Sequence, residues 1–443
     1  MTPARERVAD ALVLALAKVA VGAWVLHQGF THVSDDDYAR TVIAQQLAHA
    51  PRLDPSATSW LPLPFWLEGA AMTVAGRTLG VARAVAVVLG AASVAAPYLA
   101  MRAAGMRRAA AMVATAVTMA LPWNAWLGVA TVPEGWVGAV AAAGIVSMDR
   151  DVARPWAAAA LLAASLSRYE AWPACAVLAA LCAWRATHGG ARRRELVCAA
   201  VALAGPAAWL AWNAHAHGDA LHFLARVTTF RRAIGAADVP LGDKLLGYPR
   251  ALVEETPEVA VLGALGLLGL AARPLRERWR WPALTVLAVV AFLVVGDVRD
   301  GAPTHHPARA LTAVWWVLAA MGIDALFTRL TLLASGAPLA QIGRRHRSPV
   351  WLTAVAATLG AAWCVSLPAR WGSSPGRSEA ERREPQIARG MELRARGVEG
   401  AVVTPCAFEH FALLAAWGAP ERATVEPRTG QTPTATCPDV VER

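Results

Sequence analysis

The sequence predicts an all-α polytopic membrane protein with about eleven transmembrane helices and a small extracytoplasmic α/β tail at its C-terminal end. The 443-residue chain is 56% hydrophobic and only 17% charged, whereas soluble domains carry about 25% charged residues. Long stretches of Ala, Leu and Val alternate with short Arg-rich clusters, and strict period-two alternation is absent, which favours helices over a barrel. The chain has 19 Trp against 8 Phe, and many of these Trp lie at the ends of apolar stretches, as at a membrane interface.

The apolar stretches place the predicted spans. Several are shorter than the roughly 20 residues that a helix perpendicular to the membrane needs. The first span is expected to be retained, because it lacks a clean small-residue cleavage site. The predicted spans cover residues 11–27, 81–101, 109–127, 133–148, 155–167, 171–185, 196–213, 258–272, 282–296, 308–327 and 350–367.

The stretches at 155–167 and 171–185 could instead form one long helix. With two passages, every Arg-rich connector falls on the side of the N-terminus, whereas a single helix would place Arg192–Arg194 outside. The positive-inside bias therefore favours a short or re-entrant pair, and it explains the net charge of +10 without nucleic acid as a partner. We expect a multi-pass protein of the bacterial inner (plasma) membrane, with a cytoplasmic N-terminus and an extracytoplasmic C-terminus.

Two domains are expected. Residues 1–367 form a polytopic transmembrane domain with two long extracytoplasmic loops, 28–80 and 214–257. Residues 368–443 form a small extracytoplasmic domain, in which Cys406 and Cys437 could form a disulfide. The pattern in this domain predicts helix, strand, helix and strand at 378–396, 397–405, 407–417 and 422–426.

The first long loop is too polar to span a membrane. Its Trp60–Trp66 segment, aromatic and rich in Pro, suits the membrane surface. Residues 37–50 predict an amphipathic helix with Tyr38, Val42 and Leu47 on one side and Arg40, Gln45 and His49 elsewhere.

Three adjacent acids in this loop, Asp35, Asp36 and Asp37, are the most informative feature. Adjacent carboxylates repel one another near a low-dielectric surface, so such a cluster is typical of a general base, a metal site or a site for a cationic group. A solvated loop with an acidic helix N-terminus is the alternative. The Arg168-Tyr169-Glu170 turn is a second candidate, because charges between short spans are often functional, although an internal Arg168–Glu170 pair would also explain it.

Basic residues on the same side are candidates for binding phosphate. Arg binds phosphate oxygens in a bidentate manner, and an anionic ligand would explain Arg residues on outer loops, although simple headgroup contact is the alternative. Two adjacent His do not share a helix face, which argues against a metal site there. Glu134 begins a span on this side, where it could also serve only as an N-terminal helix acid. The basic candidates are Arg231, Arg232, Lys244, His305, His306 and Arg309.

Together these features resemble the GT-C superfamily of membrane glycosyltransferases, which includes the protein mannosyltransferases, the aminoarabinose transferase of lipid A and the GPI mannosyltransferases. The shared layout is an acidic motif after the first span, here Asp35-Asp36-Asp37-Tyr38, followed by Trp60-Leu-Pro-Leu-Pro and Gly76. His306-Pro307-Ala308-Arg309 before a late span and an extracytoplasmic tail resemble the family as well. The resemblance covers about the first 330 residues. The family often has one Asp or an Asp-Glu pair, so three Asp leave open which acid is catalytic.

The resemblance implies general-base, inverting transfer from a polyprenyl-phosphate-linked sugar to a hydroxyl of a glycan, lipid or protein acceptor. Asp35 or Asp37 would be the base, because both fit an Asp-x-Asp-Tyr pattern, and Asp36 would point elsewhere. The chain has no Gly-rich nucleotide loop, which fits a lipid-linked donor. No cofactor is implied with certainty, and a divalent metal stays open. The alternatives are a transporter or flippase of lipid-linked intermediates and a non-catalytic membrane assembly protein.

Overall fold

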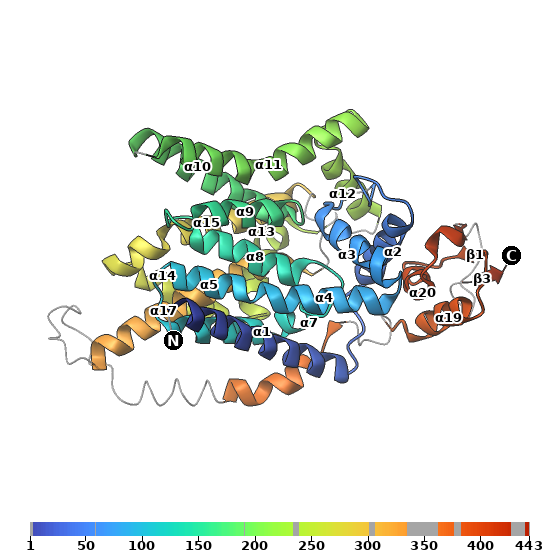
Figure 1. The fold of residues 1–443 in the computed structure, drawn as a ribbon, viewed down its shortest axis with the longest axis horizontal. Helices are drawn as coiled ribbons and strands as arrows, with labels where there is room; N and C mark the ends of the chain where they lie inside the picture. Colours follow the sequence, from blue (N-terminus) through green and yellow to red (C-terminus); the bar gives the residue numbers. More distant parts are fainter. Residues whose placement is uncertain are drawn as a thin grey trace.

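The computed structural model describes residues 3–57, 59–189, 191–233, 239–300, 306–334, 362–375, 382–426 and 439–442. Most of the apolar stretches form one bundle of helices (Figure 1). Residues 362–371 are also helical. The helices of the bundle are α1 (Pro3–His27), α4 (Leu79–Ser93), α5 (Ala95–Ala103), α6 (Arg108–Ala120), α7 (Pro122–Leu127), α8 (Glu134–Ser147), α9 (Arg154–Ser165), α10 (Trp172–His188), α11 (Arg192–His217), α14 (Pro257–Gly269), α15 (Arg273–Val298), α16 (Pro307–Ala310) and α17 (Thr312–Ala334).

Five helical segments among the described residues are long and apolar enough to cross a membrane. Helices α6, α8 and α14 are apolar but shorter. The structure therefore supports a multi-pass membrane protein, while the total of eleven spans stays a prediction, and most of the expected span at 350–367 lies outside the described residues. The five long segments are 4–27, 79–103, 192–217, 273–298 and 312–331.

Helices α9 and α10 form a hairpin rather than one long helix. Arg168 is extended between them, with φ −148° and ψ 139°, and the 3₁₀ turn Tyr169–Ala171 precedes α10. The chain then folds back, because the Cys175 thiol lies 3.6 Å from the carbonyl oxygen of Leu161. The predicted division into two helices is confirmed.

Four helices lie in the two long loops, namely α2 (Asp36–His49), α3 (Leu63–Ala75), α12 (His222–Ala233) and α13 (Leu241–Glu254). The helix predicted at 37–50 is confirmed as α2. The predicted polar side of this helix is wrong, because Arg40 and Gln45 are both buried. The reason is that α2 packs against α3 on one side and against the C-terminal domain on another (Figure 1), so almost no side of it faces solvent.

The C-terminal domain contains α19 (Glu384–Ala395), α20 (His410–Trp417), the 3₁₀ turn Pro420–Arg422, β1 (Ala401–Thr404), β2 (Ala423–Val425) and β3 (Asp439–Glu442). The strand order is β2-β1-β3. Strands β1 and β2 are parallel, with Val402 opposite Thr424, and β1 and β3 are antiparallel, with Val402 opposite Val441. The strands predicted at 397–405 and 422–426 and the helix predicted at 407–417 correspond to β1, β2 and α20.

This domain and the chain's N-terminus lie at opposite ends of the bundle (Figure 1). Such an arrangement is what opposite sides of a membrane require, although the side on which each lies stays a prediction. Cys406 is disulfide-bonded. Cys437 lies outside the described residues, so the pairing of these two cysteines stays a prediction.

Candidate active site

A cavity of about 350 Å³ opens where the two long loops meet the bundle. One part of its wall is apolar and aromatic, with Trp60, Leu61, Trp172, Phe223, Leu224 and Phe292 among its residues. The other part is charged. Such a cavity suits an amphipathic ligand, because an apolar body and a charged group can be bound side by side. The charged residues of the wall are Asp36, Arg40, Arg168, Glu170, Arg299 and Arg309.

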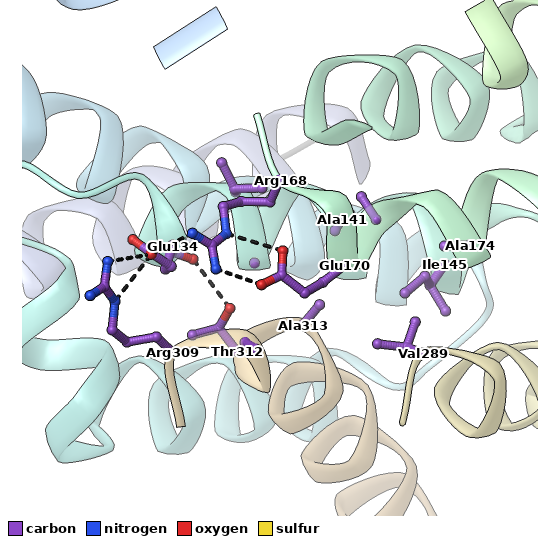
Figure 2. Close-up of a pocket in the computed structure, with 14 residues that line it drawn as sticks. Glu134, Ala141, Ile145, Arg168, Glu170, Ala174, Val289, Arg309, Thr312 and Ala313 are labelled. Carbon is purple, nitrogen blue, oxygen red and sulfur yellow. Dashed lines mark hydrogen bonds and ion pairs between the residues drawn. The ribbon is translucent and has the colours of Figure 1, made fainter. Parts of the chain in front are cut away.

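Glu134 does not line this cavity, but it binds two arginines that do. Its carboxylate oxygen Oε1 accepts hydrogen bonds from Arg309, at 2.7 Å and 3.1 Å, and lies 2.8 Å from Nη1 of Arg168. Arg168 in turn donates to both oxygens of Glu170, at 2.5 Å and 3.1 Å. Figure 2 shows these four side chains in a row, with Glu134 between the two arginines. One buried acid thus holds two guanidinium groups side by side, and each of them also pairs with a second acid, Glu170 or Asp36.

Local sequence explains how these side chains converge. Pro133 precedes α8, so Glu134 is the first residue of that helix. Pro307 begins the short helix α16, which carries Arg309. Helices α8 and α17 approach closely at Gly138, where a Cβ atom would lie 2.2 Å from the Thr312 hydroxyl oxygen. This glycine allows the contact that brings Glu134 within reach of Arg309.

The three adjacent acids point in three directions. Asp37 is buried and accepts hydrogen bonds from the backbone N–H groups of Val33, at 3.0 Å, and Thr131, at 2.8 Å, on its two oxygens. Asp35 instead forms a bidentate salt bridge with Arg383 of the C-terminal domain. Only Asp36 lines the cavity. Asp36 diverges from its neighbours by about 100° per residue, as expected for a helix, but it is Asp36, and not Asp35 or Asp37, that faces the cavity, so the expectation that Asp36 points away from the site is wrong.

One carboxylate oxygen of Asp36 accepts a hydrogen bond, and the other is available to a ligand. Oδ2 accepts a hydrogen bond from Nη1 of Arg309 at 3.0 Å, and the same nitrogen donates to the Ser34 hydroxyl at 3.0 Å. Oδ1 accepts no hydrogen bond from the residues that the structure describes. The side chain is 39% exposed, so solvent or a ligand in the cavity can reach this oxygen.

Arg40, like Arg299, lines the cavity although the sequence analysis did not select it. It is 2% exposed, lines the cavity one turn after Asp36, and stacks its guanidinium carbon 4.4 Å from the centre of the Trp60 ring. Its Nε and Nη1 atoms are buried without a hydrogen-bond partner among the described residues. An i, i+4 relation to Asp36 was the available signal. The Pro-rich loop that buries Arg40 has no helical period, so its sequence did not predict that it would cover this side chain.

Glu68 of α3 lies behind Arg40. Burial raises the pKa of its carboxyl to about 8, although the charge of Arg40 acts in the opposite direction. Burial also lowers the pKa of Arg40, to about 10. Arg40 thus remains a cation at neutral pH, while Glu68 is largely protonated, so that the negative charges acting on Arg40 are mainly those of Glu134 and Asp36.

The other residues that the sequence predicted for the site lie in different parts of the structure. Tyr169 lines the cavity, stacks on Phe223 with ring centres 4.7 Å apart and donates to the Ser59 carbonyl oxygen at 2.6 Å. Four further predicted residues do not line it. Arg231 pairs with Asp297 at 2.7 Å, Lys244 pairs with Asp300 at 2.6 Å, Arg232 is exposed, and His306 lies against Trp123 with ring centres 5.5 Å apart. His305 lies outside the described residues.

The structure, as far as it is described, contains no group of three or more His, Cys, Asp and Glu that could hold a metal ion. Metal dependence therefore stays open.

Solved structures of similar fold include two membrane enzymes. The chain aligns over 96% of its length with ArnT from Cupriavidus metallidurans bound to undecaprenyl phosphate, covering 89% of that chain at 13% identity and a TM-score of 0.57. It aligns over 87% of its length with the archaeal oligosaccharyltransferase AglB from Archaeoglobus fulgidus, in complex with an inhibitory peptide and a dolichol-phosphate, at 14% identity and a TM-score of 0.51. It spans 58% of the length of AglB. No family model and no curated protein sequence matches the chain.

Both proteins are GT-C membrane glycosyltransferases. The resemblance predicted from the sequence is therefore confirmed at the level of the fold. At such low identity the similarity concerns the fold alone, so activity and substrates must be argued from the site.

Proposed function

We propose that this chain is a membrane glycosyltransferase that transfers a sugar from a polyprenyl-phosphate-linked donor to an acceptor hydroxyl at the extracytoplasmic face. The observation that carries the proposal is the cavity, in which an accessible carboxylate and buried guanidinium groups lie beside a wide apolar wall. A lipid-linked sugar has matching parts, namely an apolar chain, an anionic phosphate and a sugar. The two proteins of similar fold were solved with polyprenyl-type phosphates, which supports a donor of this class.

In the proposed reaction Asp36 is the general base. Its Oδ1 takes the proton from the acceptor hydroxyl while the hydroxyl oxygen forms a bond to the anomeric carbon. The bond from that carbon to the phosphate oxygen breaks on the opposite side, so the configuration inverts and the polyprenyl phosphate leaves with the electron pair. Arg309 orients Asp36 through Oδ2.

The leaving phosphate gains negative charge and needs donors that are already in place. Arg40 suits this role, because its Nε and Nη1 atoms have no partner among the described residues. Arg168 is less suited to binding phosphate, because Glu134 and Glu170 already occupy much of its guanidinium. We assign these two acids to holding Arg168 and Arg309 in position.

We also propose that the cavity faces the extracytoplasmic side of a bacterial inner membrane. The C-terminal domain lies at that end of the bundle, opposite the N-terminus (Figure 1). The charge bias of the connectors assigns the N-terminus to the cytoplasm.

The test uses the purified full chain in lipid vesicles, with a set of polyprenyl-phosphate sugars and acceptors that carry free hydroxyls. We expect release of polyprenyl phosphate together with a glycoside of inverted anomeric configuration. A chain that moves the lipid-linked sugar between leaflets without consuming it would support the flippase alternative and contradict the proposal.

A further inference from the structure

We propose that the C-terminal domain positions Asp36 through the salt bridge between Arg383 and Asp35, so that the active site is complete only when this domain is docked. The inference rests on the proposed function, because it concerns the placement of the proposed base. Arg383 and Asp35 are positioning residues in this account, since neither lines the cavity.

The salt bridge has the geometry of a strong pair. Nε of Arg383 lies 2.7 Å from Oδ1 of Asp35, and Nη2 lies 2.9 Å from Oδ2. The two side chains are 13% and 22% exposed. A bidentate, partly buried guanidinium–carboxylate pair is geometrically specific and is screened less than a surface pair. It therefore holds the backbone of Asp35 at a defined distance from α19.

Helix α2 is also part of the hydrophobic core of the C-terminal domain. Tyr38 and Val42 are buried in one cluster with Leu393, Val403 and Leu414 of that domain. One turn further along the helix, the Gln45 side-chain amide donates a hydrogen bond of 2.8 Å to the carbonyl oxygen of Ala415. The helix that begins with Asp36 is thus anchored to the C-terminal domain along its length.

The transmembrane domain holds the other side of the same motif. The two oxygens of Asp37 accept hydrogen bonds from the loop before α2 and from Thr131 of the segment before α8. Asp36 lies between these two attachments, and consecutive Cα atoms are only about 3.8 Å apart. Movement of Asp35 therefore moves Asp36 relative to Arg309. The three acids divide their roles, with the outer two fixing the middle one.

A second salt bridge between the same two domains supplies a matched control. Arg77, in the segment before α4, donates to both oxygens of Glu421 at 2.7 Å and 2.9 Å. These side chains are 26% and 21% exposed, comparable with the Arg383 pair. Neither belongs to the acidic motif or lines the cavity. Loss of either bridge should weaken docking to a similar extent, but only the loss of the Arg383 bridge should misplace Asp36.

The experiment compares Arg383→Ala, Arg77→Ala, Asp35→Asn and the double variant Asp35→Asn/Arg383→Ala in the full chain. We measure kcat, the KM for the donor, and the thermal midpoint in detergent. Because misplacing a reacting group by about 1 Å can lower a rate a hundredfold, we expect kcat to fall about ten- to a hundredfold in Arg383→Ala, with the donor KM little changed. The double variant should be no slower than Arg383→Ala. Arg77→Ala should lower the midpoint about equally and keep kcat within about threefold of wild type.

Arg383→Lys should restore part of kcat, because it keeps the charge but not the bidentate geometry. Equal loss of kcat in Arg77→Ala and Arg383→Ala would overturn the proposal, because the bridge would then act only through docking. Unchanged kcat in Arg383→Ala would overturn it as well. If the wild-type chain transfers no sugar, the proposed function fails. The double-mutant cycle in the thermal midpoint would still show whether the Arg383–Asp35 bridge exists.

Discussion

Replacing Arg40 should increase the stability of the protein while it removes donor binding. Two guanidinium donors of this buried side chain have no partner among the described residues. Each buried unmade hydrogen bond costs about 1–3 kcal/mol. The stacking on Trp60 returns about 0.5–2 kcal/mol. Arg40→Met keeps the length and the apolar contact of the side chain, so the ligand-free variant should gain about 3 kcal/mol in the free energy of unfolding, the middle of two unmade bonds at about 1–3 kcal/mol each less the stacking at about 0.5–2 kcal/mol.

Arg309→Met is the matched control, because Arg309 is equally buried but donates to Glu134, Asp36 and Ser34. Its loss leaves Glu134 short of a partner, and breaking a buried ion pair costs about 3–5 kcal/mol. The two arginine variants should therefore shift stability in opposite directions. Thermal midpoints from tryptophan fluorescence in detergent, with and without polyprenyl phosphate, measure both effects.

Added polyprenyl phosphate should raise the midpoint of the wild type and have little effect on Arg40→Met. A charge-assisted hydrogen bond is worth about 1.5–3 kcal/mol, which corresponds to roughly a 10- to 150-fold loss of donor affinity. The reasoning is refuted if Arg40→Met is as unstable as Arg309→Met and still responds to polyprenyl phosphate, because Arg40 would then be a structural residue.

Three further predictions follow from the site and the topology. Glu134→Gln should destabilise the protein by about 3–5 kcal/mol, because the buried Arg309 and the partly buried Arg168 lose their shared acid, whereas the exposed Glu399→Gln should have little effect in the same thermal assay. The free energy of unfolding should fall as pH rises from about 5 to 8, because the raised pKa of Glu68, about 8, makes the folded state bind more protons than the unfolded state in this window. The slope for one such group is about 1.4 kcal/mol per pH unit. A Glu68→Gln variant that keeps this full slope would contradict the assignment. Reporter fusions after Arg192 and after Arg377 should report opposite sides of the membrane, and the same side for both would show that the number of spans is wrong.

The sequence predicted the bundle well because lipid imposes simple rules on it. Apolar stretches bounded by Arg clusters located the helices, although α1 and α15 begin eight and nine residues earlier than predicted, and the charge bias correctly separated α9 from α10. The same rules predicted that all the candidate residues face one side of the membrane. Of this set Asp36, Glu134, Arg168, Glu170 and Arg309 lie together, whereas Arg231, Arg232 and Lys244 do not line the cavity.

The details of the site depended on packing that no local pattern encodes. Arg40 is buried against Trp60 and Phe65, which lie 20 and 25 positions further along the chain, while other sides of α2 are covered by the C-terminal domain, more than 300 positions away. Which of Asp35, Asp36 and Asp37 faces the cavity depends on the positions of Arg383, which binds Asp35, and Thr131, which binds Asp37. Motif comparison favoured the outer two acids, whereas their partners leave only the middle one facing the cavity.

The central claim is that Asp36 is the carboxylate that activates the acceptor, and the direct measurement is the kcat for sugar transfer of Asp36→Asn. The variant keeps the size of the side chain and removes its basicity. General-base catalysis contributes about a hundredfold to ten-thousandfold, so kcat should fall by that factor while polyprenyl phosphate still raises the thermal midpoint. Asp36→Asn with wild-type kcat would contradict the account. A loss of kcat of the predicted size in Asp37→Asn, with the kcat of Asp36→Asn unchanged, would contradict it as well.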